Sequence, residues 1–343
     1  MSRDRGVPSP QRLGRYGRFA LATASVTVLS MAASGCVVVH GEREILPAAT
    51  RAEAARALKD FTSAYNKADK TYDRSQDADR VTGALADIDG AKLKAGSKNS
   101  PDGNPSHAPL TLTDAKFTIP EKAGWPRWFV ADTAANKGAK DARWLLVFTR
   151  SDADDVWAVS YLTILDADDV PTFKTDGDGY AQPVTADDAA LAIAPDDLGD
   201  AYATYLRSKP AASAAGEVFA PGTYTSEWRA GRRKNARKPG LARQYIDEPL
   251  TKGDYAPVGL RTTDGGALVF FATHHYEKQT AAPGVDLPVT DPNVQALLTG
   301  EVKSSLTLEH VSNQAVLDPA KNASDKQVRF LGRVDGMTKA KGE

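Results

Sequence analysis

The stretch TRAEAARALKDFTSAYNKADKTY, residues 50–72, predicts a long helix, and this helix decides the fold class that we expect. Thr50 and Glu53 give the T-x-x-E pattern of a capping box, in which each side chain accepts a hydrogen bond from the other residue's backbone N–H. Apolar side chains then recur at spacings of three and four, which places them on one side of a helix. This stripe consists of Ala52, Ala55, Leu58, Phe61, Tyr65, Ala68 and Tyr72. Such a helix must bury its stripe, so we expect a sheet packed against it.

The segments that follow this helix predict the rest of a first α+β domain. A weaker helical pattern contains Val81, Leu85 and Ile88 and ends near Gly90. After a Gly/Ser/Asn/Pro-rich loop, segments rich in β-branched and aromatic residues predict four strands. These strands cover residues 110–119, 127–133, 143–150 and 156–165. The short acidic connection SDADD between the last two predicts a hairpin.

The second half of the chain repeats this order of elements. A helical segment at 185–208 and a short helix around Trp228 precede further strand patterns. These patterns cover residues 255–262, 267–277, 304–311, 314–318 and 328–334, with TDGG as a hairpin turn between the first two. The segments VFTRSDADDVWAVSYL and GLRTTDGGALVFFAT are alike, since each has a strand, an acidic turn and a longer apolar strand. We therefore predict two α+β domains, 48–183 and 184–343, each with a long helix on a curved antiparallel sheet and related by internal duplication.

The predicted order of helix, shorter helix and antiparallel strands resembles the nuclear-transport-factor-like, or cystatin-like, cone fold in tandem. The resemblance implies a curved sheet packed on the long helix of each half. In that superfamily the cone holds a small-molecule pocket in some members and serves as a docking surface in others. The resemblance therefore leaves the function open.

Residues 1–35 have the features of an export signal. They carry five arginines and one aspartate, which leaves a net charge of −5 for the remainder of a chain whose total is −1. The apolar stretch from Phe19 to Ala33 has 15 residues, so a helix over it would span about 22 Å, short of the ~30 Å hydrocarbon core. We therefore expect a cleaved signal and not a permanent transmembrane helix.

The small residues that follow, Ala33-Ser34-Gly35-Cys36, resemble the lipobox of bacterial lipoproteins, although leucine is usual where Ala33 stands. The resemblance implies cleavage between Gly35 and Cys36 and a diacylglyceryl group with palmitate-type chains on the Cys36 thiol. Two acyl chains suffice for stable anchoring, since each buried methylene contributes about 0.8 kcal/mol. Residues 36–47 would then be a lipidated tether on the outer face of the cell membrane. An ordinary cleavable signal or an inert thiol are the alternatives.

The sequence contains none of the usual catalytic motifs, namely G-x-S-x-G, S-x-x-K, H-E-x-x-H and G-x-x-x-x-G-K-[ST]. The adjacent pair His274 and His275 falls in a strand, so the two side chains point to opposite faces and cannot chelate one metal. One of them could pair with His310 or with a carboxylate from a neighbouring strand and act as a base. We favour one exposed and one hydrogen-bonded histidine over this catalytic role.

Two acidic turns, which begin at Asp166 and Asp176, could bind calcium, but neither fits the EF-hand spacing. A looser set of ligands remains open, and it contains Asp166, Asp168, Asp169, Asp176 and Asp178. We favour solvated turn aspartates, because aspartate stabilises turns by local hydrogen bonds. We therefore predict no metal and no cofactor.

A run of basic residues in EWRAGRRKNARKPGLAR (227–243) gives a candidate anionic-surface patch. It comprises Arg229, Arg232, Arg233, Lys234, Arg237, Lys238 and Arg243. Such a patch could meet anionic lipid or a cell-wall polymer, and the alternative is a solvated loop. The acidic remainder of the chain argues against nucleic acid. Three tryptophans, Trp125, Trp128 and Trp144, could line a ligand pocket, but we favour core packing.

These features predict a lipid-anchored extracytoplasmic protein that binds or scaffolds an unknown partner without catalysis. The alternative is an envelope enzyme in which His275 and a nearby acid lie in a pocket. A histidine that points into a cavity with a carboxylate within hydrogen-bond reach would favour the alternative.

Overall fold

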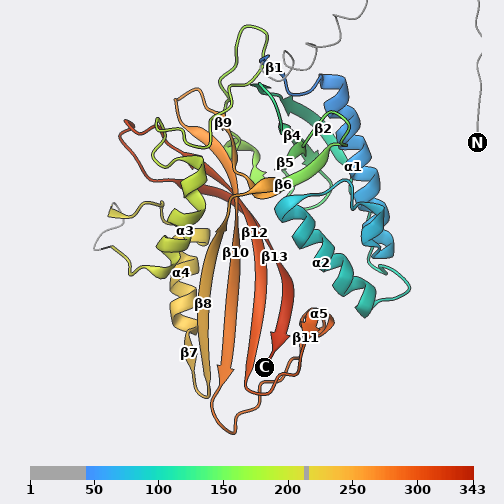
Figure 1. The fold of residues 1–343 in the computed structure, drawn as a ribbon, viewed down its shortest axis with the longest axis vertical. Helices are drawn as coiled ribbons and strands as arrows, with labels where there is room; N and C mark the ends of the chain where they lie inside the picture. The colour runs from blue at the N-terminus through green and yellow to red at the C-terminus, as the bar shows by residue number, and fades with distance from the viewer. Residues whose placement is uncertain (1–43, 212–215) are drawn as a thin grey trace, which may run out of the picture. The chain divides into compact units, whose positions relative to one another are not determined.

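The long helix is present and starts at its capping box. In the computed structural model, which describes residues 44–211 and 216–343 (Figure 1), α1 (Arg51–Thr71) follows Thr50. The backbone N–H of Glu53 donates to Thr50 Oγ1 at 3.1 Å, and the N–H of Thr50 donates to Glu53 Oε2 at 2.7 Å. The buried stripe begins at Ala54 and not at Ala52, because the spacing of three and four that includes Leu58, Phe61 and Ala68 also includes Ala54.

The other helices are shorter. They are α2 (Gly83–Asn99), α3 (Leu198–Arg207), α4 (Trp228–Asn235) and α5 (Pro292–Leu297). Single helical turns lie at Arg74–Gln76, Ala167–Asp169, Pro195–Asp197, Thr223–Glu227 and Gly253–Tyr255. Helix α2 continues beyond Gly90, where the helix was predicted to end. A Cβ at Gly90 would lie 2.9 Å from Arg74 Nε, so this glycine serves a close contact and does not end the helix.

Two antiparallel sheets form the rest of the structure, together with the short pair β1 (Leu46–Pro47) and β3 (Glu121–Lys122). The four-stranded sheet has the order β2 (Leu112–Thr118), β4 (Arg127–Ala135), β5 (Ala142–Arg150) and β6 (Ala158–Asp166). The seven-stranded sheet has the order β11 (Leu298–Thr299), β13 (Arg329–Gly342), β12 (Ser305–Asp318), β10 (Ala267–Ala281), β8 (Leu241–Leu250) and β7 (Arg237–Lys238). β9 (Val258–Arg261) pairs with β10, and β11 alone runs parallel to its neighbour, β13.

The sequence located most strands but not all of them. Both hairpins are confirmed, since SDADD joins β5 to β6 and TDGG joins β9 to β10. The segments 304–311 and 314–318 form the single strand β12. The sequence did not predict β8, which lies inside the sheet next to β10, or α5.

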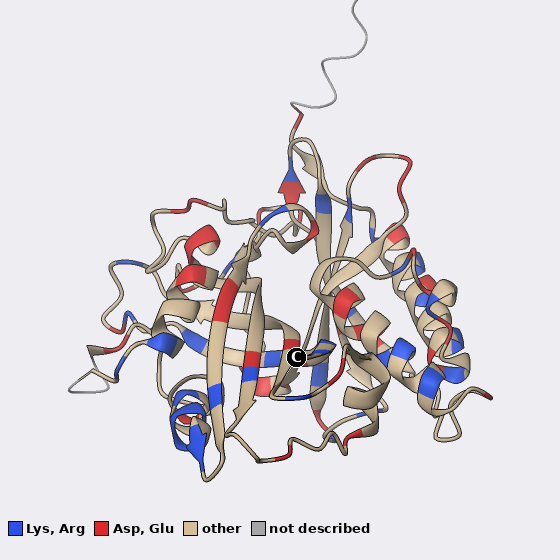
Figure 2. Cartoon of the chain, turned by 60° about the horizontal axis from the view of Figure 1, so that its bottom comes forward, with Lys and Arg blue, Asp and Glu red and all other residues tan. Residues whose placement is uncertain are grey.

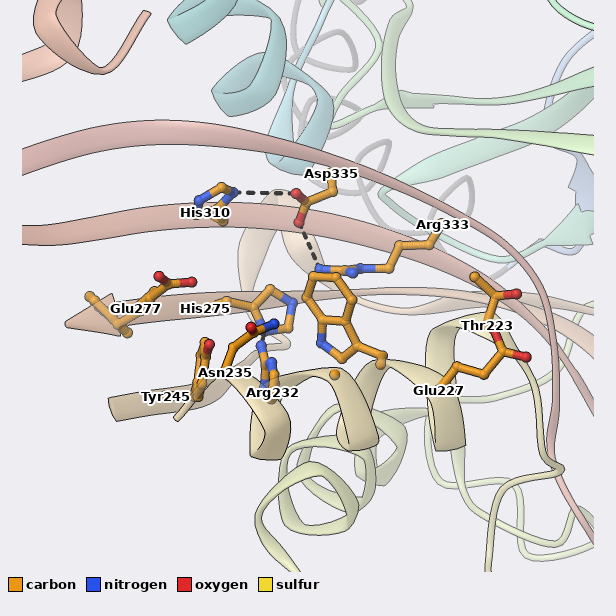
Figure 3. A pocket seen from close by; sticks show the side chains of 13 residues that line it. Thr223, Glu227, Arg232, Asn235, Tyr245, His275, Glu277, His310, Arg333 and Asp335 are labelled. Carbon is orange, nitrogen blue, oxygen red and sulfur yellow. Dashed lines mark hydrogen bonds and ion pairs between the residues drawn. The ribbon is translucent and has the colours of Figure 1, made fainter. Parts of the chain in front are cut away.

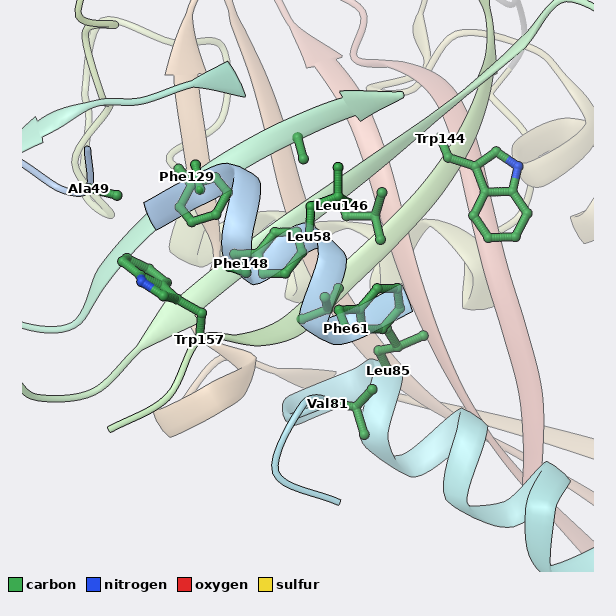
Figure 4. Packing of buried hydrophobic residues seen from close by; sticks show 14 of the residues in the cluster. Ala49, Leu58, Phe61, Val81, Leu85, Phe129, Trp144, Leu146, Phe148 and Trp157 are labelled. Carbon is green, nitrogen blue, oxygen red and sulfur yellow. The ribbon is translucent and has the colours of Figure 1, made fainter. Parts of the chain in front are cut away.

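The stripe of α1 packs on the four-stranded sheet through an aromatic cluster (Figure 4). The rings of Phe129 and Phe148 stack with centroids 4.9 Å apart and an interplanar angle of 6°. Phe61 of α1 meets the Phe148 ring edge-on at 6.0 Å, and Trp157 meets Phe129 at 4.9 Å. Offset and edge-on pairs of this kind add about 0.5–1.5 kcal/mol each beyond area burial. This cluster confirms that the long helix is packed on a sheet.

A second cluster contains residues from both sheets, so the two halves share part of their core. Trp128 and Tyr161 of the first sheet pack with Phe270 and Val311 of the second. The Tyr161 hydroxyl also donates to the carbonyl of Tyr255 at 2.7 Å. The described residues, 44–211 and 216–343, belong to one compact unit. The mixed helix and sheet content is consistent with the α+β class.

The predicted duplication and the cone-fold resemblance are not confirmed. The first half has a 21-residue helix and a four-stranded sheet, whereas the second half has the 10-residue α3 and a seven-stranded sheet. The boundary between residues 183 and 184 stays a prediction. Within residues 44–211 and 216–343, none of the helices has the length and hydropathy needed to cross a membrane.

Candidate binding pocket

A cavity of about 410 Å³ lies between α4 and the seven-stranded sheet (Figure 3). Its volume is in the range of small-molecule pockets. From α4 come Trp228, Arg232 and Asn235, which recur every three or four residues and therefore share one side of the helix. From the sheet come Tyr245 of β8, His275 and Glu277 of β10, His310 of β12, and Arg333 and Asp335 of β13.

The adjacent histidines of β10 lie on opposite faces of the sheet, as the strand pattern predicts. His275 is directly opposite Asp247 of β8 and His310 of β12, so these side chains share the pocket face. His274 lies on the other face, where its Nε2 is 3.4 Å from Glu309 Oε2. His275 forms a hydrogen bond with a carboxylate of a neighbouring strand, as the favoured arrangement requires of one histidine. His274 is half-buried near Glu309, so the exposed histidine of that arrangement is a correction.

His275 is held by a buried hydrogen-bond network at the wall of the pocket. Its Nδ1 is 2.5 Å from Asp247 Oδ1, and its Nε2 is 2.7 Å from Ser312 Oγ and 2.9 Å from Thr273 Oγ1. Gln314 Nε2 donates to both hydroxyls, at 2.7 Å and 2.8 Å. Each of these five side chains is at least 96% buried. A network of this kind fixes its members in one arrangement, because an unpaired polar group in this place would be costly.

The surroundings of His275 keep its imidazole neutral. Its pKa is lowered to about 4, because burial and the charges of Arg333 and Arg232 outweigh the hydrogen bond and the charge of Asp247, which raise the pKa. In the neutral ring, Nδ1–H donates to the Asp247 carboxylate and Nε2 accepts from the Ser312 hydroxyl. At neutral pH the group therefore has no free basic nitrogen facing the cavity.

Arg232 of α4 forms an ion pair with Asp247, whose carboxylate is hydrogen-bonded to His275. Its Nη1 lies 2.8 Å and 2.7 Å from the two oxygens of Asp247, which is 1% exposed. Burial alone would raise the pKa of Asp247, but the hydrogen bond from His275 and the charge of Arg232 outweigh it and hold the pKa below its usual value. The ion pair therefore ties α4 to the sheet across the inner end of the pocket.

The indole ring of Trp228 lies near two guanidinium groups. The Cζ atom of Arg333 is 4.4 Å from the Trp228 ring centroid, and that of Arg232 is 5.1 Å away. Arg333 Nη2 also donates to Asp335 Oδ1 at 2.7 Å, and Asp335 Oδ2 is 3.3 Å from His310 Nδ1. Both guanidiniums are therefore paired with a carboxylate and stacked on the indole.

The charges at the pocket nearly cancel. Arg232 is paired with Asp247, Arg333 with Asp335, and Glu277 with Arg243 at 2.9 Å. Glu227, at the rim, is exposed and forms no ion pair with the described part of the chain. Three buried donors, Trp228 Nε1, Arg232 Nε and Arg333 Nε, lack a hydrogen-bond partner there. The pocket thus offers hydrogen-bonding groups and a surplus carboxylate, but neither guanidinium is free to bind an anion.

The predicted basic patch is only partly at the surface. Arg229 is 4% exposed, with its Nη2 2.6 Å from Glu217 Oε1 and its Cζ 3.9 Å from the Tyr205 ring centroid. Arg232 and Arg243 form the ion pairs described above, so these three residues are a correction to the prediction. Their charges are used inside the fold because carboxylates from distant parts of the chain reach them. The exposed members of the patch are Arg233, Lys234, Arg237 and Lys238 (Figure 2).

The other candidate residues lie away from the pocket. Trp128 and Trp144 are buried core residues, as predicted, and Trp125 lies against Arg127 and Arg150. The Asp176 carboxylate accepts the backbone N–H groups of Asp178 and Tyr180, which is a local turn bond. No cluster of three or more metal-ligating side chains is present in the part of the chain that the structure describes. Gly35 and Cys36 fall outside that part, so the lipidation of Cys36 stays a prediction.

Comparison with known proteins assigns the chain to a family. Residues 45–342 match the model described as "Domain of unknown function (DUF8094)". The chain belongs to this family. It is 67% identical to an uncharacterized lipoprotein of Streptomyces avermitilis and 60% identical to one of Streptomyces coelicolor, each over the full 343 residues of both chains. A further uncharacterized lipoprotein of Streptomyces coelicolor is 28% identical over 67% of this chain and 64% of its own length.

No solved structure matches the chain. The printed names of the relatives are consistent with an envelope-associated lipoprotein and with the lipobox resemblance around Cys36. They name no ligand and no reaction, so the pocket itself must supply the argument for function.

Several pocket residues were not singled out by the sequence, among them Asp247, Ser312, Arg333 and Asp335. Asp247 lies in LARQYIDEPL, whose inward positions also include Arg243. A strand with charged residues on its inner side has no hydrophobic alternation, so the sequence does not predict it. Strand β13 was predicted, but nothing in its sequence distinguishes Arg333, which lines the pocket, from a residue at an ordinary surface position.

Proposed function

We propose that the protein is a lipid-anchored, extracytoplasmic binding protein whose ligand occupies the pocket between α4 and the seven-stranded sheet. The observation that carries this proposal is the pocket itself. Its inner wall is fixed by the Arg232–Asp247–His275 network, while buried donors of Trp228 and Arg333 have no partner within the described chain. A preorganised cavity with unused hydrogen-bonding capacity is what a ligand site requires. The lipoprotein names of the relatives support the envelope location.

The charge of the pocket defines the class of ligand. Both guanidiniums already face a carboxylate, and Glu227 and Glu277 lie at the rim. An added anion would meet a carboxylate surplus and no free cation, so it is disfavoured. A small polar ligand that is neutral, zwitterionic or positively charged fits the pocket best. Its hydroxyl, amide or amine groups would satisfy the unpaired donors and the rim carboxylates.

The pocket lies away from the end of the body where the N-terminal segment attaches. In Figure 1, β1 lies at the top, and α4 lies lower, beside β8. If Cys36 carries the anchor, the tether joins the body at the β1 end, and α4, which lines the pocket, lies away from that end. Substitution of Cys36→Ala should release the protein from the membrane fraction, and unchanged membrane retention and N-terminal mass would refute the anchor.

The pocket can be blocked without removing any of its hydrogen bonds. Gly231 lines it, lies within α4, and a Cβ there meets no atom within 4 Å. Gly231→Phe should therefore fill the cavity, and a non-glycine residue in a helix gains up to about 1 kcal/mol of helix propensity. The matched control is Gly177→Phe, because Gly177 also has open space around it but lies outside the pocket.

We expect intrinsic tryptophan fluorescence and thermal shift to detect binding of at least one of three probes, N-acetylglucosamine, alanine or choline. The signal should be lost in Gly231→Phe and kept in Gly177→Phe, and succinate and inorganic phosphate should give none. Binding of the two anions alone, or equal binding by both variants, would contradict the proposed site.

A second candidate function is hydrolysis, because Ser312, His275 and Asp247 are connected in the order of a catalytic triad at 2.7 Å and 2.5 Å. Three facts disfavour it. Ser312 is fully buried, its hydroxyl also accepts from Gln314, and the pKa of His275 is too low for an efficient base. We expect a fluorophosphonate probe to leave the native protein unlabelled. Labelling that disappears in Ser312→Ala would establish the hydrolase instead.

A further inference from the structure

We propose that the outer side of α4 and the adjoining chain ends form a binding surface for a phosphate-bearing polyanion of the cell envelope. The surface consists of six cationic side chains, which we call the distal basic surface: Arg207, Lys209, Arg233, Lys234, Arg237 and Lys238. All six residues are exposed, and none forms an ion pair with the described residues. Arg233 Nη2 donates to the carbonyl of Ser208 at 2.5 Å, which holds the end of α3 against α4. This bond brings Arg233 next to the end of α3, which carries Arg207 and Lys209.

The cations on the two sides of α4 differ in whether they have an ion-pair partner. On the inner side, Arg229 is paired with Glu217 and Arg232 with Asp247, so these charges are cancelled. On the outer side and in β7, four consecutive cations of the same segment face solvent without a carboxylate. This surplus lies on a chain whose net charge beyond residue 35 is −5. A concentrated positive surface on an acidic body raises the local concentration of anionic partners.

The arrangement fits a polymer better than a single anion. The six side chains come from two helices and a short strand, and they do not converge on a cavity. A repeating polyanion can contact such a surface at several points and releases counterions at each, which gives affinity that falls steeply with salt. One isolated phosphate would gain only a fraction of these contacts.

The position of the surface favours a wall polymer over the protein's own membrane. The body begins at the β1 end, and β7 lies at the opposite end in Figure 1. Seven residues lie between Cys36 and the first described residue, Glu44, so the eight residue steps that join the two extend at most about 29 Å. This preference rests on the proposed anchor: if Cys36 is lipidated, the tether joins the body at the end opposite β7, which leaves β7 available to a partner other than the lipid that holds the anchor.

The test uses the full-length protein reconstituted in phosphatidylcholine vesicles and titrated with fluorescently labelled long-chain polyphosphate at increasing NaCl concentrations. The surface variant is Arg233→Gln/Lys234→Gln/Arg237→Gln/Lys238→Gln. The matched control removes four exposed cations of α1, Arg56→Gln/Lys59→Gln/Lys67→Gln/Lys70→Gln. The melting temperature of each variant confirms folding, and a parallel titration replaces polyphosphate by added phosphatidylglycerol vesicles.

We expect the surface variant to lose more than ten-fold in polyphosphate affinity at low salt and to show a shallower salt dependence, while the control binds as the wild type does. Equal losses in both variants, or no polyphosphate binding by the wild type, would overturn the proposal. Stronger binding to the phosphatidylglycerol vesicles than to polyphosphate would also overturn the proposal if the surface variant loses it. The partner would then be lipid. The pocket-blocking Gly231→Phe leaves these cations intact and should bind polyphosphate normally.

Discussion

Two buried clusters of ionisable groups, one beside the pocket and one beside α2, show opposite responses to burial. Beside the pocket, Asp247 is 1% exposed, yet its pKa lies below the usual value because Arg232 and His275 face it. Beside α2, Asp77 is fully buried, and neither carboxylate oxygen has a hydrogen-bond partner in the described chain. Burial and the neighbouring Asp89 raise the pKa of Asp77 to about 8.

The difference lies in the number of cations within reach. The charges of Lys92 and Arg74 reach Asp89, but Lys92 is bonded to Asp69 at 2.9 Å, and neither cation forms an ion pair with Asp77 or Asp89 within the described residues. Burial also raises the pKa of Asp89. The comparison teaches that a buried carboxylate in this fold is stabilised as an anion where a cationic side chain is bonded to it, as Arg232 is to Asp247 and Lys92 is to Asp69. The pocket wall is such a place, and the α2 cluster is not.

Removing the dedicated cation should have the largest effect. Arg232→Met leaves the buried Asp247 carboxylate without its ion pair, so we expect a loss of about 3–5 kcal/mol in the free energy of unfolding. Arg233→Met, one residue further along α4 but exposed, should change it by less than about 0.5 kcal/mol. Urea denaturation of both variants makes the comparison. Equal, small losses would show that the inner ion pair has no special role.

Removing an ionisable group from the α2 cluster should raise the free energy of unfolding, whereas removing Arg232 should lower it. Asp77→Asn removes a carboxyl group that must stay protonated in the fold, so we expect a gain of about 2 kcal/mol in stability at pH 8. The control, Asp102→Asn, changes an exposed loop aspartate and should have no measurable effect. A destabilised Asp77→Asn protein would mean that Asp77 is ionised and satisfied in the fold.

The two clusters also predict opposite slopes in the pH dependence of the melting temperature. The pKa of His275 is lowered to about 4, so the unfolded chain binds more protons between about 6.5 and 4, and stability falls as the pH falls through this range. The pKa of Asp77 is raised to about 8, so the folded chain binds more protons between about 4 and 8, and stability falls as the pH rises.

Thermal unfolding across pH 4–9 separates these contributions. His275→Gln should flatten the acid limb, below about pH 6.5, and leave the alkaline limb, between about pH 6.5 and 8, in place. Asp77→Asn should flatten the alkaline limb. The two windows overlap below about pH 6.5 with opposite signs, so Asp77→Asn should also steepen the acid limb and not flatten it. If either substitution flattens both limbs, the clusters are coupled and the comparison fails.

The sequence predicted the parts of the fold that local chemistry determines. The capping box at Thr50, the SDADD and TDGG hairpins and the opposite directions of His274 and His275 depend on residues close together in the chain. Strand β8 was missed because its inward positions carry Arg243 and Asp247, whose partners lie in distant segments. The same reason made Arg229 and Arg232 resemble surface charges. A long-range ion pair leaves no periodic signal in the sequence.

The central claim is that the cavity beside α4 is the site of a small polar ligand. The most direct test is mass spectrometry of the small molecules that remain bound to the protein purified from the membranes of the producing cell. We expect one compound of neutral or positive charge to accompany the wild type and Gly177→Phe, and to be absent from Gly231→Phe. If the same compounds accompany all three proteins, or if the compound lost is an anion, the pocket is not the site described here.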